Sequence, residues 1–213
     1  MKKIVLLTAA FTITLAGAAL AQDKKSNAEY ISIGPVIGFS HNWVSNMYGS
    51  NKLNAGGYIG AGLVYSKDPH WAWGGQVTFS KEGYRVGDPI NNISTGIPVY
   101  LRIPLRAYYF FGNYGDDIRP KVYLGPSFGI KLAESDDTRG GDVLNAQNIG
   151  PCRTFEAGIN AGVGMDVRVK KGVWFDTDLG YTQGLTDAVK DPAGTYNTSQ
   201  NLAISFGLLF GIR

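Results

Sequence analysis

The residues of this chain that are best suited to chemistry are charged side chains at alternate positions inside otherwise apolar segments. They are Arg102, Arg106, Glu156, Asp166, Arg168, Asp176 and Asp178. Residues two or four apart in an extended strand point to the same face, so Asp176 and Asp178 share a face, as do Arg102 and Arg106. Enclosed charges persist only when they are paired and hydrogen-bonded. The pattern therefore predicts a network of buried ion pairs rather than a catalytic centre.

The candidate for catalysis is His41, which lies beside Ser40 and near Ser45 at the start of a polar segment. A histidine base and a serine nucleophile could modify lipids, but the pair needs a third, orienting group in a defined geometry. The sequence identifies no such group. We interpret His41 as a loop histidine and predict that the protein is not an enzyme.

Ion and cofactor sites have weak support in the sequence. The acidic segment 134–142 could coordinate calcium through clustered oxygens, but it lacks the ligand spacing of an EF-hand loop, which favours a solvated surface loop. Cys152 is the single cysteine, which excludes an intrachain disulfide and a cysteine metal site. We interpret it as an unpaired loop thiol, and we predict no metal and no cofactor.

The elements that must position the charges are strands. From Leu202 to Ile212 every even position is large and apolar, whereas the odd positions are small or polar apart from Leu209. Gly, Ala and Ser would leave a soluble core nearly empty, so the apolar face is predicted to meet lipid and the small face to line a lumen. A soluble ligand-binding barrel would need its apolar face inside.

This alternation recurs along the chain and predicts eight strands. The segments are 29–40, 55–66, 71–83, 96–111, 119–132, 153–169, 173–183 and 200–213. On the seventh segment the predicted lipid face comprises Val173, Phe175, Leu179 and Tyr181. Short connections alternate with long polar ones, as in outer-membrane barrels with short periplasmic turns and longer extracellular loops. The predicted fold is all-β: an eight-stranded antiparallel up-and-down transmembrane β-barrel with both termini periplasmic.

The interior of such a barrel is only wide enough for side chains to fill it. We therefore expect the charged network to plug the lumen. Pro98 and Pro104 fall inside the fourth predicted strand. Because proline cannot donate to a ladder and a closed barrel has no free edge, a bulge or a local loss of pairing is expected there.

The first residues have the pattern of a cleavable signal peptide. Lys2 and Lys3 precede an apolar stretch, and Ala19-Leu20-Ala21 supplies the small residues of a cleavage site. The predicted domains are a signal peptide at 1–21 and one barrel domain at 22–213. The chain has 20 basic and 17 acidic residues, and the loss of both lysines leaves it nearly neutral. This balance argues against a nucleic-acid partner, which would select a basic patch.

Several motifs resemble one known family. The segments Val99-Tyr100-Leu101-Arg102-Ile103-Pro104-Leu105, Val122–Gly129, Gly158–Asp166 and Asp178–Leu185 resemble, in order and spacing, the strands of the outer-membrane β-barrel domain family. These are porin-family or PorT-like small barrels of Gram-negative bacteria. The resemblance covers the whole mature chain and implies location and fold more than chemistry. The chain departs from the family at its end, where Arg213 replaces the usual terminal aromatic residue.

The leading functional hypothesis is an integral outer-membrane protein with a structural, adhesive or surface-interaction role. The alternatives are a passive pore for small solutes, which the narrow lumen opposes, and a lipid-modifying enzyme. The expected partners are outer-membrane lipid and the barrel-assembly machinery, and the protein is expected to be a monomer. The sequence does not identify a surface ligand.

Overall fold

The computed structural model describes residues 31–46, 50–51, 53–87, 93–113, 116–139, 151–189 and 196–212. They form eight long strands at the predicted places. These are β1 (Ile31–Val44), β3 (Ala55–Ser66), β4 (Trp71–Lys81), β6 (Ile93–Phe110), β7 (Ile118–Arg139), β8 (Phe155–Lys170), β9 (Val173–Asp187) and β10 (Thr198–Ile212). Two short strands, β2 (Ser50–Asn51) and β5 (Tyr84–Gly87), lie between them. The predicted signal peptide lies outside the described residues.

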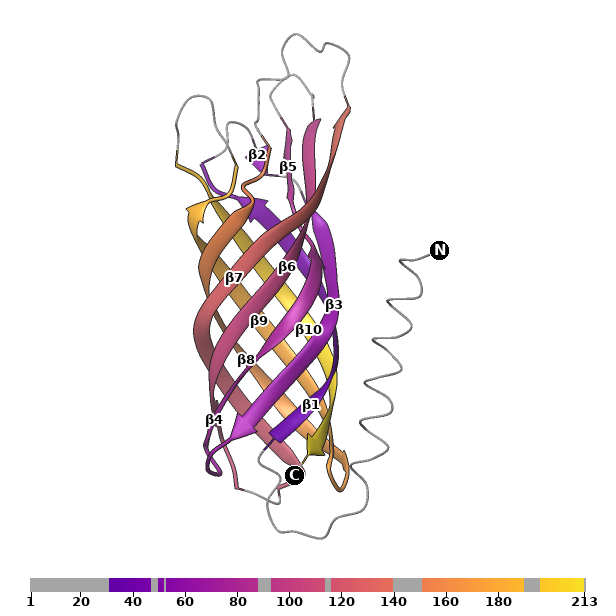
Figure 1. Ribbon diagram of the computed structural model, residues 1–213, viewed down its shortest axis with the longest axis vertical. Helices are drawn as coiled ribbons and strands as arrows, with labels where there is room; N and C mark the ends of the chain where they lie inside the picture. The colour runs from indigo at the N-terminus through magenta and orange to yellow at the C-terminus, as the bar shows by residue number, and fades with distance from the viewer. Residues whose placement is uncertain are drawn as a thin grey trace.

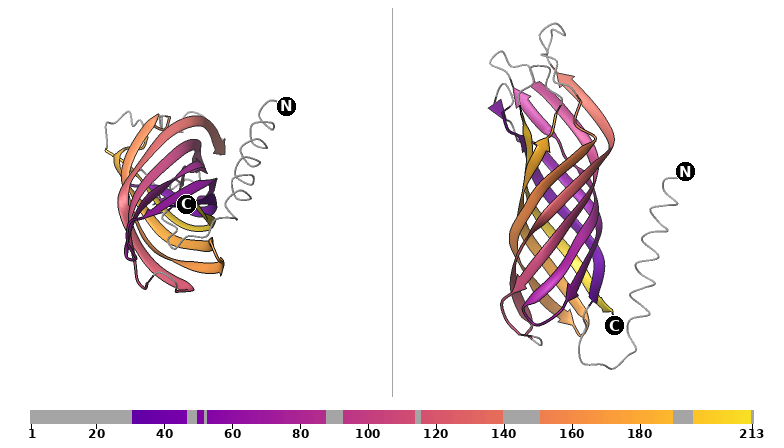
Figure 2. Two further views of the ribbon diagram at one scale, coloured as in Figure 1. Left: turned by 60° about the horizontal axis from the view of Figure 1, so that its bottom comes forward. Right: turned by 60° about the vertical axis from the view of Figure 1, so that its left-hand side comes forward.

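The strands close into an antiparallel up-and-down barrel. Each long strand pairs with its neighbours in the chain, and β1 pairs with β10 to complete the ring. Figures 1 and 2 show the strands tilted around a common axis, with the end of β10 at the same end of the barrel as the start of β1. The predicted fold is therefore confirmed. Among the described residues, no helix is long and apolar enough to cross a membrane.

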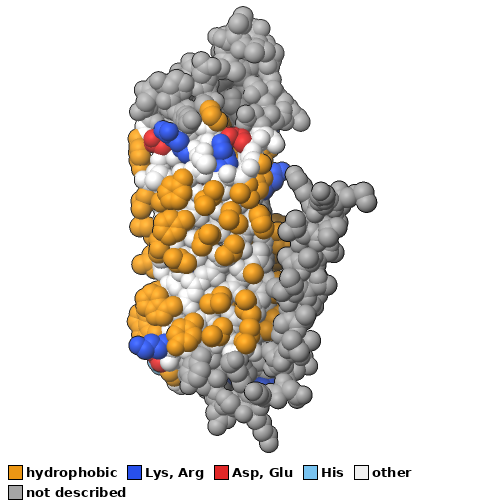
Figure 3. Space-filling view, viewed as in Figure 1, with side chains coloured by type: hydrophobic (Ala, Val, Ile, Leu, Met, Phe, Trp, Pro, Cys, Tyr) orange, Lys and Arg blue, Asp and Glu red, His pale blue; other side chains and the backbone are white. Residues whose placement is uncertain are grey.

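The outer wall is apolar. A single row across five neighbouring strands consists of Phe39, Ile204, Leu179, Val163 and Val122, each paired with the next in register. All five side chains are exposed. Figure 3 shows such side chains as a band across the face in view, with charged side chains above and below it. A large exposed apolar surface of this kind suits lipid rather than water.

The prolines interrupt the ladder, as expected. The pairing of β6 with β7 shifts register between Val99 and Tyr100, next to Pro98. On the other side of β6, the Glu82 N–H donates to the Pro98 carbonyl at 3.0 Å, whereas Pro98 has no N–H to return. The sheet is broken there between β4 and β5, and Gly83 takes a φ of 135°. Near Pro104, the pairing of β4 with β6 lacks partners for Ile103 and Pro104, although the register on either side is the same.

The turns at the end where β1 starts and β10 ends, called here the short-turn end, are tight. In the turn between β3 and β4, the Asp68 carboxylate accepts the N–H groups of His70 at 2.9 Å and Trp71 at 2.7 Å. These two hydrogen bonds lower the pKa of Asp68, with the bond from Trp71 the larger cause. The opposite, long-loop end carries β2, β5 and the extended upper parts of β6 and β7 (Figure 1).

Val173, predicted to face lipid, is buried. The pairing of β8 with β9 shifts register between Arg168 and Lys170, beside the turn that joins these strands. The register partner of Val173 is Phe210 of the predicted lipid face, and its neighbour Trp174 packs against buried side chains of the lumen. The alternation therefore continues through Val173, and Phe175, Leu179 and Tyr181 are exposed as predicted.

Candidate functional site

The lower part of the lumen holds a group of five charged residues, named here the Lys121 cluster. It consists of Lys121, Arg106, Asp166, Asp176 and Asp178. The Lys121 ammonium lies 2.8 Å from Asp166 Oδ1 and 3.0 Å from Asp178 Oδ1, and it also pairs with Asp176. Arg106 donates to Asp178 Oδ2 at 3.1 Å and to Asn160 Oδ1 at 2.9 Å. All five side chains are buried, and buried groups remain charged only when they are paired with opposite charges.

A second group, the Arg102 cluster, lies nearer the long-loop end and comprises Arg102, Glu82 and Glu156. Arg102 donates to Glu82 through Nε at 2.7 Å and through Nη2 at 2.5 Å, and to Glu156 at 2.5 Å. Tyr100 and Ser199 hydroxyls donate to Glu156 at 2.9 and 3.0 Å. These bonds join side chains of β6, β8 and β10 with the segment that follows β4, so the cluster spans the lumen.

Glycines make room for these long side chains. The Tyr123 side chain of β7 lies over glycines of the next two strands, β8 and β9. A Cβ at Gly162 or Gly180 would lie only 2.4 or 2.3 Å from the Tyr123 hydroxyl oxygen. The Tyr123 ring in turn lies 4.3 Å from the Arg106 guanidinium carbon, in cation–π geometry. Gly162 of β8 and Gly180 of β9 thus leave space for the large Tyr123 side chain of β7.

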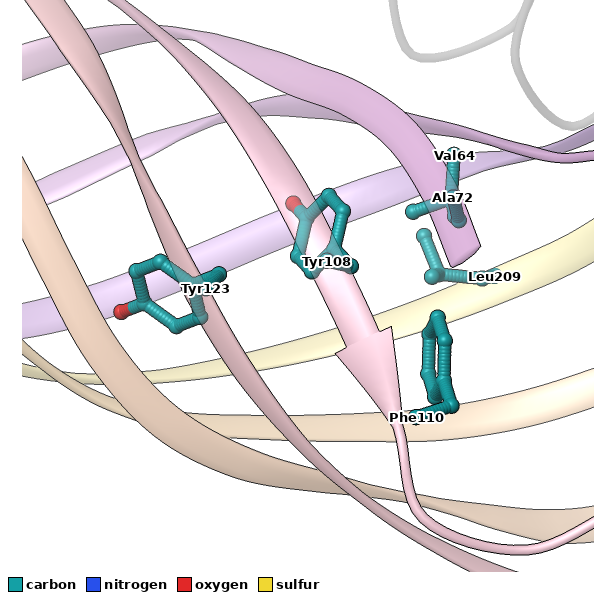
Figure 4. Packing of buried hydrophobic residues seen from close by; sticks show 6 residues of the cluster. All are labelled: Val64, Ala72, Tyr108, Phe110, Tyr123 and Leu209. Carbon is teal, nitrogen blue, oxygen red and sulfur yellow. The ribbon is translucent and has the colours of Figure 1, made fainter. Parts of the chain in front are cut away.

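Apolar side chains close the lumen beyond each cluster. At the short-turn end, six buried residues form a floor (Figure 4). They are Val64, Ala72, Tyr108, Phe110, Tyr123 and Leu209. Leu209, the one large residue on the inward face of the last strand, is part of this floor. At the long-loop end, the buried side chains of Val44, Tyr84, Cys152, Ala188 and Val189 form a lid.

The structure brings together six of the seven charged residues that the sequence singled out. Arg102 and Glu156 lie in one cluster, and Arg106, Asp166, Asp176 and Asp178 lie in the other. Arg168 lies apart. It pairs with the exposed Asp117 at 3.3 Å and stacks on Trp174, near the short-turn end. Sequence reasoning did not include Lys121 and Glu82 in the network, although both occupy inward positions of the alternating pattern.

Comparison with known proteins decides the family. The model of the "Outer membrane protein beta-barrel domain" matches residues 20–190. The chain belongs to this outer-membrane β-barrel family. It is therefore an integral protein of the outer membrane. The model covers seven of the eight long strands fully or nearly so, up to the end of β9.

Solved structures of small outer-membrane barrels have the same fold. OprG from Pseudomonas aeruginosa superposes with a TM-score of 0.52 at 11% identity, covering 84% of this chain and 93% of that one. Neisserial surface protein A gives a TM-score of 0.51 at 14% identity, covering 88% of this chain and 100% of that one. No curated protein sequence matches this family member.

The structure does not assemble the candidate catalytic pair in this barrel. Ser40 is buried on the inner face and its hydroxyl accepts a hydrogen bond from Asn42, whereas His41 faces the other side and stacks on Trp43. The Ser45 hydroxyl bonds to Thr198 at 2.8 Å. Within the part of the chain that is described, no group of three or more His, Cys, Asp or Glu residues is arranged to hold a metal.

The acidic segment and the cysteine meet at the lid. Glu134 pairs with Lys131 at 2.5 Å and accepts the Cys152 N–H at 2.8 Å. Residues 140–142 of this acidic segment lie outside the described residues. Burial, followed by the nearby Glu134 carboxylate, raises the pKa of the Cys152 thiol. Since the thiolate is the reactive form, Cys152 is a structural thiol of the lid.

Proposed function

We propose that this protein is a closed outer-membrane barrel that works through its long-loop end, in a surface-interaction or adhesive role, and does not conduct solutes. The observation that carries the proposal is the filled lumen. Two ion-pair clusters connect side chains of β6, β7, β8 and β9 inside the lumen, and apolar side chains pack beyond both of them. An eight-stranded barrel has no spare width around such contacts.

The orientation in this proposal follows from the connections. Outer-membrane barrels place short turns in the periplasm and long loops outside the cell, so both termini are periplasmic and β5 and the upper parts of β6 and β7 stand on the cell surface. Leu53 and Tyr196, both exposed, offer apolar contacts there. Asn46 donates to the Tyr196 carbonyl at 3.0 Å, which ties two long connections together. We further propose that the barrel is a monomer in contact with outer-membrane lipid and is inserted by the assembly machinery.

The closed lumen is tested by conductance. The purified protein, inserted into a planar bilayer, is expected to give no steady current at neutral pH, because ions meet paired charges and then an apolar floor. A porin reconstituted in the same way supplies the positive control. A stable ohmic channel of porin size from the unmodified protein would overturn the proposal and favour the passive pore.

The orientation is tested by cysteine labelling of intact cells with a maleimide too large to cross the outer membrane. Leu53→Cys is expected to react, because Leu53 is 74% exposed at the long-loop end. Lys67→Cys, in the short turn after β3, is expected to react only after cell lysis. The native Cys152 is expected to react with neither treatment until the barrel unfolds, because it is buried and its pKa is raised. Labelling of Lys67→Cys in intact cells would contradict the proposed orientation.

A further inference from the structure

Two basic side chains lie on the outer wall of the barrel at its long-loop end. Lys81 is the last residue of β4, and Arg85 lies in β5. Both are exposed, whereas Tyr84 is buried in the lid, so the two cations share the outward face. Their partners on β6, Val99 and Thr95, are four residues apart. The two backbone positions are therefore roughly 13 Å apart.

The strands beside these cations do not neutralise them. β3, which flanks β4, contains no charged residue, and the arginines of β6 are bonded to carboxylates in the lumen. Asp137 of β7 is in register with Thr95, one strand further from Arg85. Among the described residues, neither Lys81 nor Arg85 takes part in an ion pair. Two cations against one acidic residue give this sector of the wall a positive excess.

The same sector borders the apolar band. Phe79, two residues before Lys81 on the outward face, is 54% exposed. In the row that contains Lys81, the next positions are Gly57 of β3 and Phe39 of β1. A Cβ at Gly57 would meet only the Gly38 carbonyl oxygen. The wall therefore has a gap between Phe39 and Lys81, about 10 Å across from backbone to backbone.

This combination indicates the chemistry of a ligand. Cations directly above a lipid-facing surface meet the headgroups of lipids. Lysine binds phosphate as a point charge, and arginine binds it through paired N–H groups. A gap between apolar side chains suits a hydrocarbon chain rather than a soluble anion. The ligand is therefore a phosphorylated lipid.

The orientation of the barrel selects the lipid. With the long-loop end on the cell surface, Lys81 and Arg85 face the outer leaflet. In Gram-negative bacteria the lipid of this leaflet is lipopolysaccharide, which carries phosphate groups on both sugars at the head of its acyl chains. Two separated cations match two separated phosphates better than they match the single phosphate of a phospholipid.

We propose that Lys81 and Arg85 bind the phosphate groups of one lipopolysaccharide molecule, and that an acyl chain of this molecule lies over Gly57. The proposal rests on the orientation proposed above. The bound lipid covers the wall where the ladder is interrupted, because Gly83, opposite the break at Pro98, lies between the two cations.

The test is a titration of the purified mature protein, in micelles of a neutral detergent, with fluorescently labelled lipopolysaccharide. Lys81→Gln combined with Arg85→Gln is expected to weaken binding about 25-fold, since each cation near an anionic lipid surface contributes about fivefold. Lys67→Gln combined with Lys171→Gln is the matched control. It removes two exposed lysines at the short-turn end and is expected to leave the affinity unchanged. Equal losses in both double variants, or no loss in the first, would overturn the site.

Two competitors identify the lipid. Unlabelled lipopolysaccharide is expected to displace the probe, whereas lipopolysaccharide treated with a phosphatase is not. Phosphatidylglycerol is expected to compete weakly, and competition as strong as that of lipopolysaccharide would reject the proposed ligand. Gly57→Leu keeps both cations but fills the gap, and it is expected to lower the affinity. An unchanged affinity would reject the position of the acyl chain.

A stability measurement separates loss of the ligand from loss of the fold. In phosphatidylcholine vesicles without lipopolysaccharide, both double variants are expected to unfold at the same urea concentration as the wild type, because all four side chains are exposed. The titration in micelles has no sidedness. Failure of the cysteine-labelling experiment would therefore overturn the orientation, whereas failure of the titration would overturn the phosphate site.

Discussion

Replacing Lys121 with methionine is expected to destabilise the folded barrel by about 3–5 kcal/mol, the usual cost of removing one partner from a buried ion pair. Methionine keeps most of the side-chain volume, so the loss is electrostatic. Three carboxylates that converge on the Lys121 ammonium would then face one another without it, although Arg106 still pairs with Asp178. Urea unfolding in lipid vesicles, followed by the heat-modifiable mobility shift on gels, measures the change.

Two controls separate this effect from a general one. Lys81→Met removes a lysine from the exposed end of β4 and is expected to change stability by less than about 1 kcal/mol, as surface substitutions do. Adding Asp176→Asn to Lys121→Met removes one excess negative charge and should restore part of the lost stability. If Lys121→Met were as stable as the wild type, the cluster would not hold the lumen closed.

Replacing Leu179 with arginine is expected to cost about 2–4 kcal/mol, the penalty for arginine on the lipid face at the bilayer midplane. Leu179 lies near the middle of β9, is half exposed, and is flanked in register by the apolar Val163 and Ile204. Arginine at this depth must thin the bilayer or carry water with it. The same unfolding measurement in vesicles gives the value.

The matched control lies on the same strand and face. Leu185 is about as exposed as Leu179 but lies near the long-loop end of β9. Leu185→Arg is expected to cost only about 0–1 kcal/mol, because the penalty declines toward the membrane interface. Equal costs for both substitutions would mean that the apolar band does not mark the bilayer.

The fold was accessible from the sequence because one physical rule governs most of the wall. A strand between lipid and a filled lumen must alternate large apolar with small or polar residues, and the row from Phe39 to Val122 obeys this rule. The rule does not predict burial in every case, since Val173 is buried although it keeps the outward parity. The strand β5 also escaped prediction, since it continues the sheet on the far side of the break opposite Pro98.

The members of the site were largely predictable, but their partners were not. The alternation of side chains along each strand identifies which charged residues point into the lumen. Which charges meet depends on strand tilt and on how far each side chain reaches. Arg102 of β6 reaches Glu156 of β8 across β7, because Gly129 leaves space in front of its guanidinium. Arg168 occupies an inward position of its strand, as the other predicted network residues do. It lies near the turn, however, and pairs there with the exposed Asp117.

The pairing of β1 with β10 sets the order in which the barrel can be made. Residues at opposite ends of the folded domain, such as Ile31 and Ile212, are direct partners, so the ring contains one contact of nearly the greatest possible sequence separation. Closing so long a loop is slow, because the chain entropy is lost before the contacts between β1 and β10 form and compensate for it. Until β10 is synthesised and docked, the nascent sheet has two open edges, each a template for aggregation. Pairing of β1 with β10 is therefore the last step of folding. Until then, the two open edges of the sheet must be covered by another molecule.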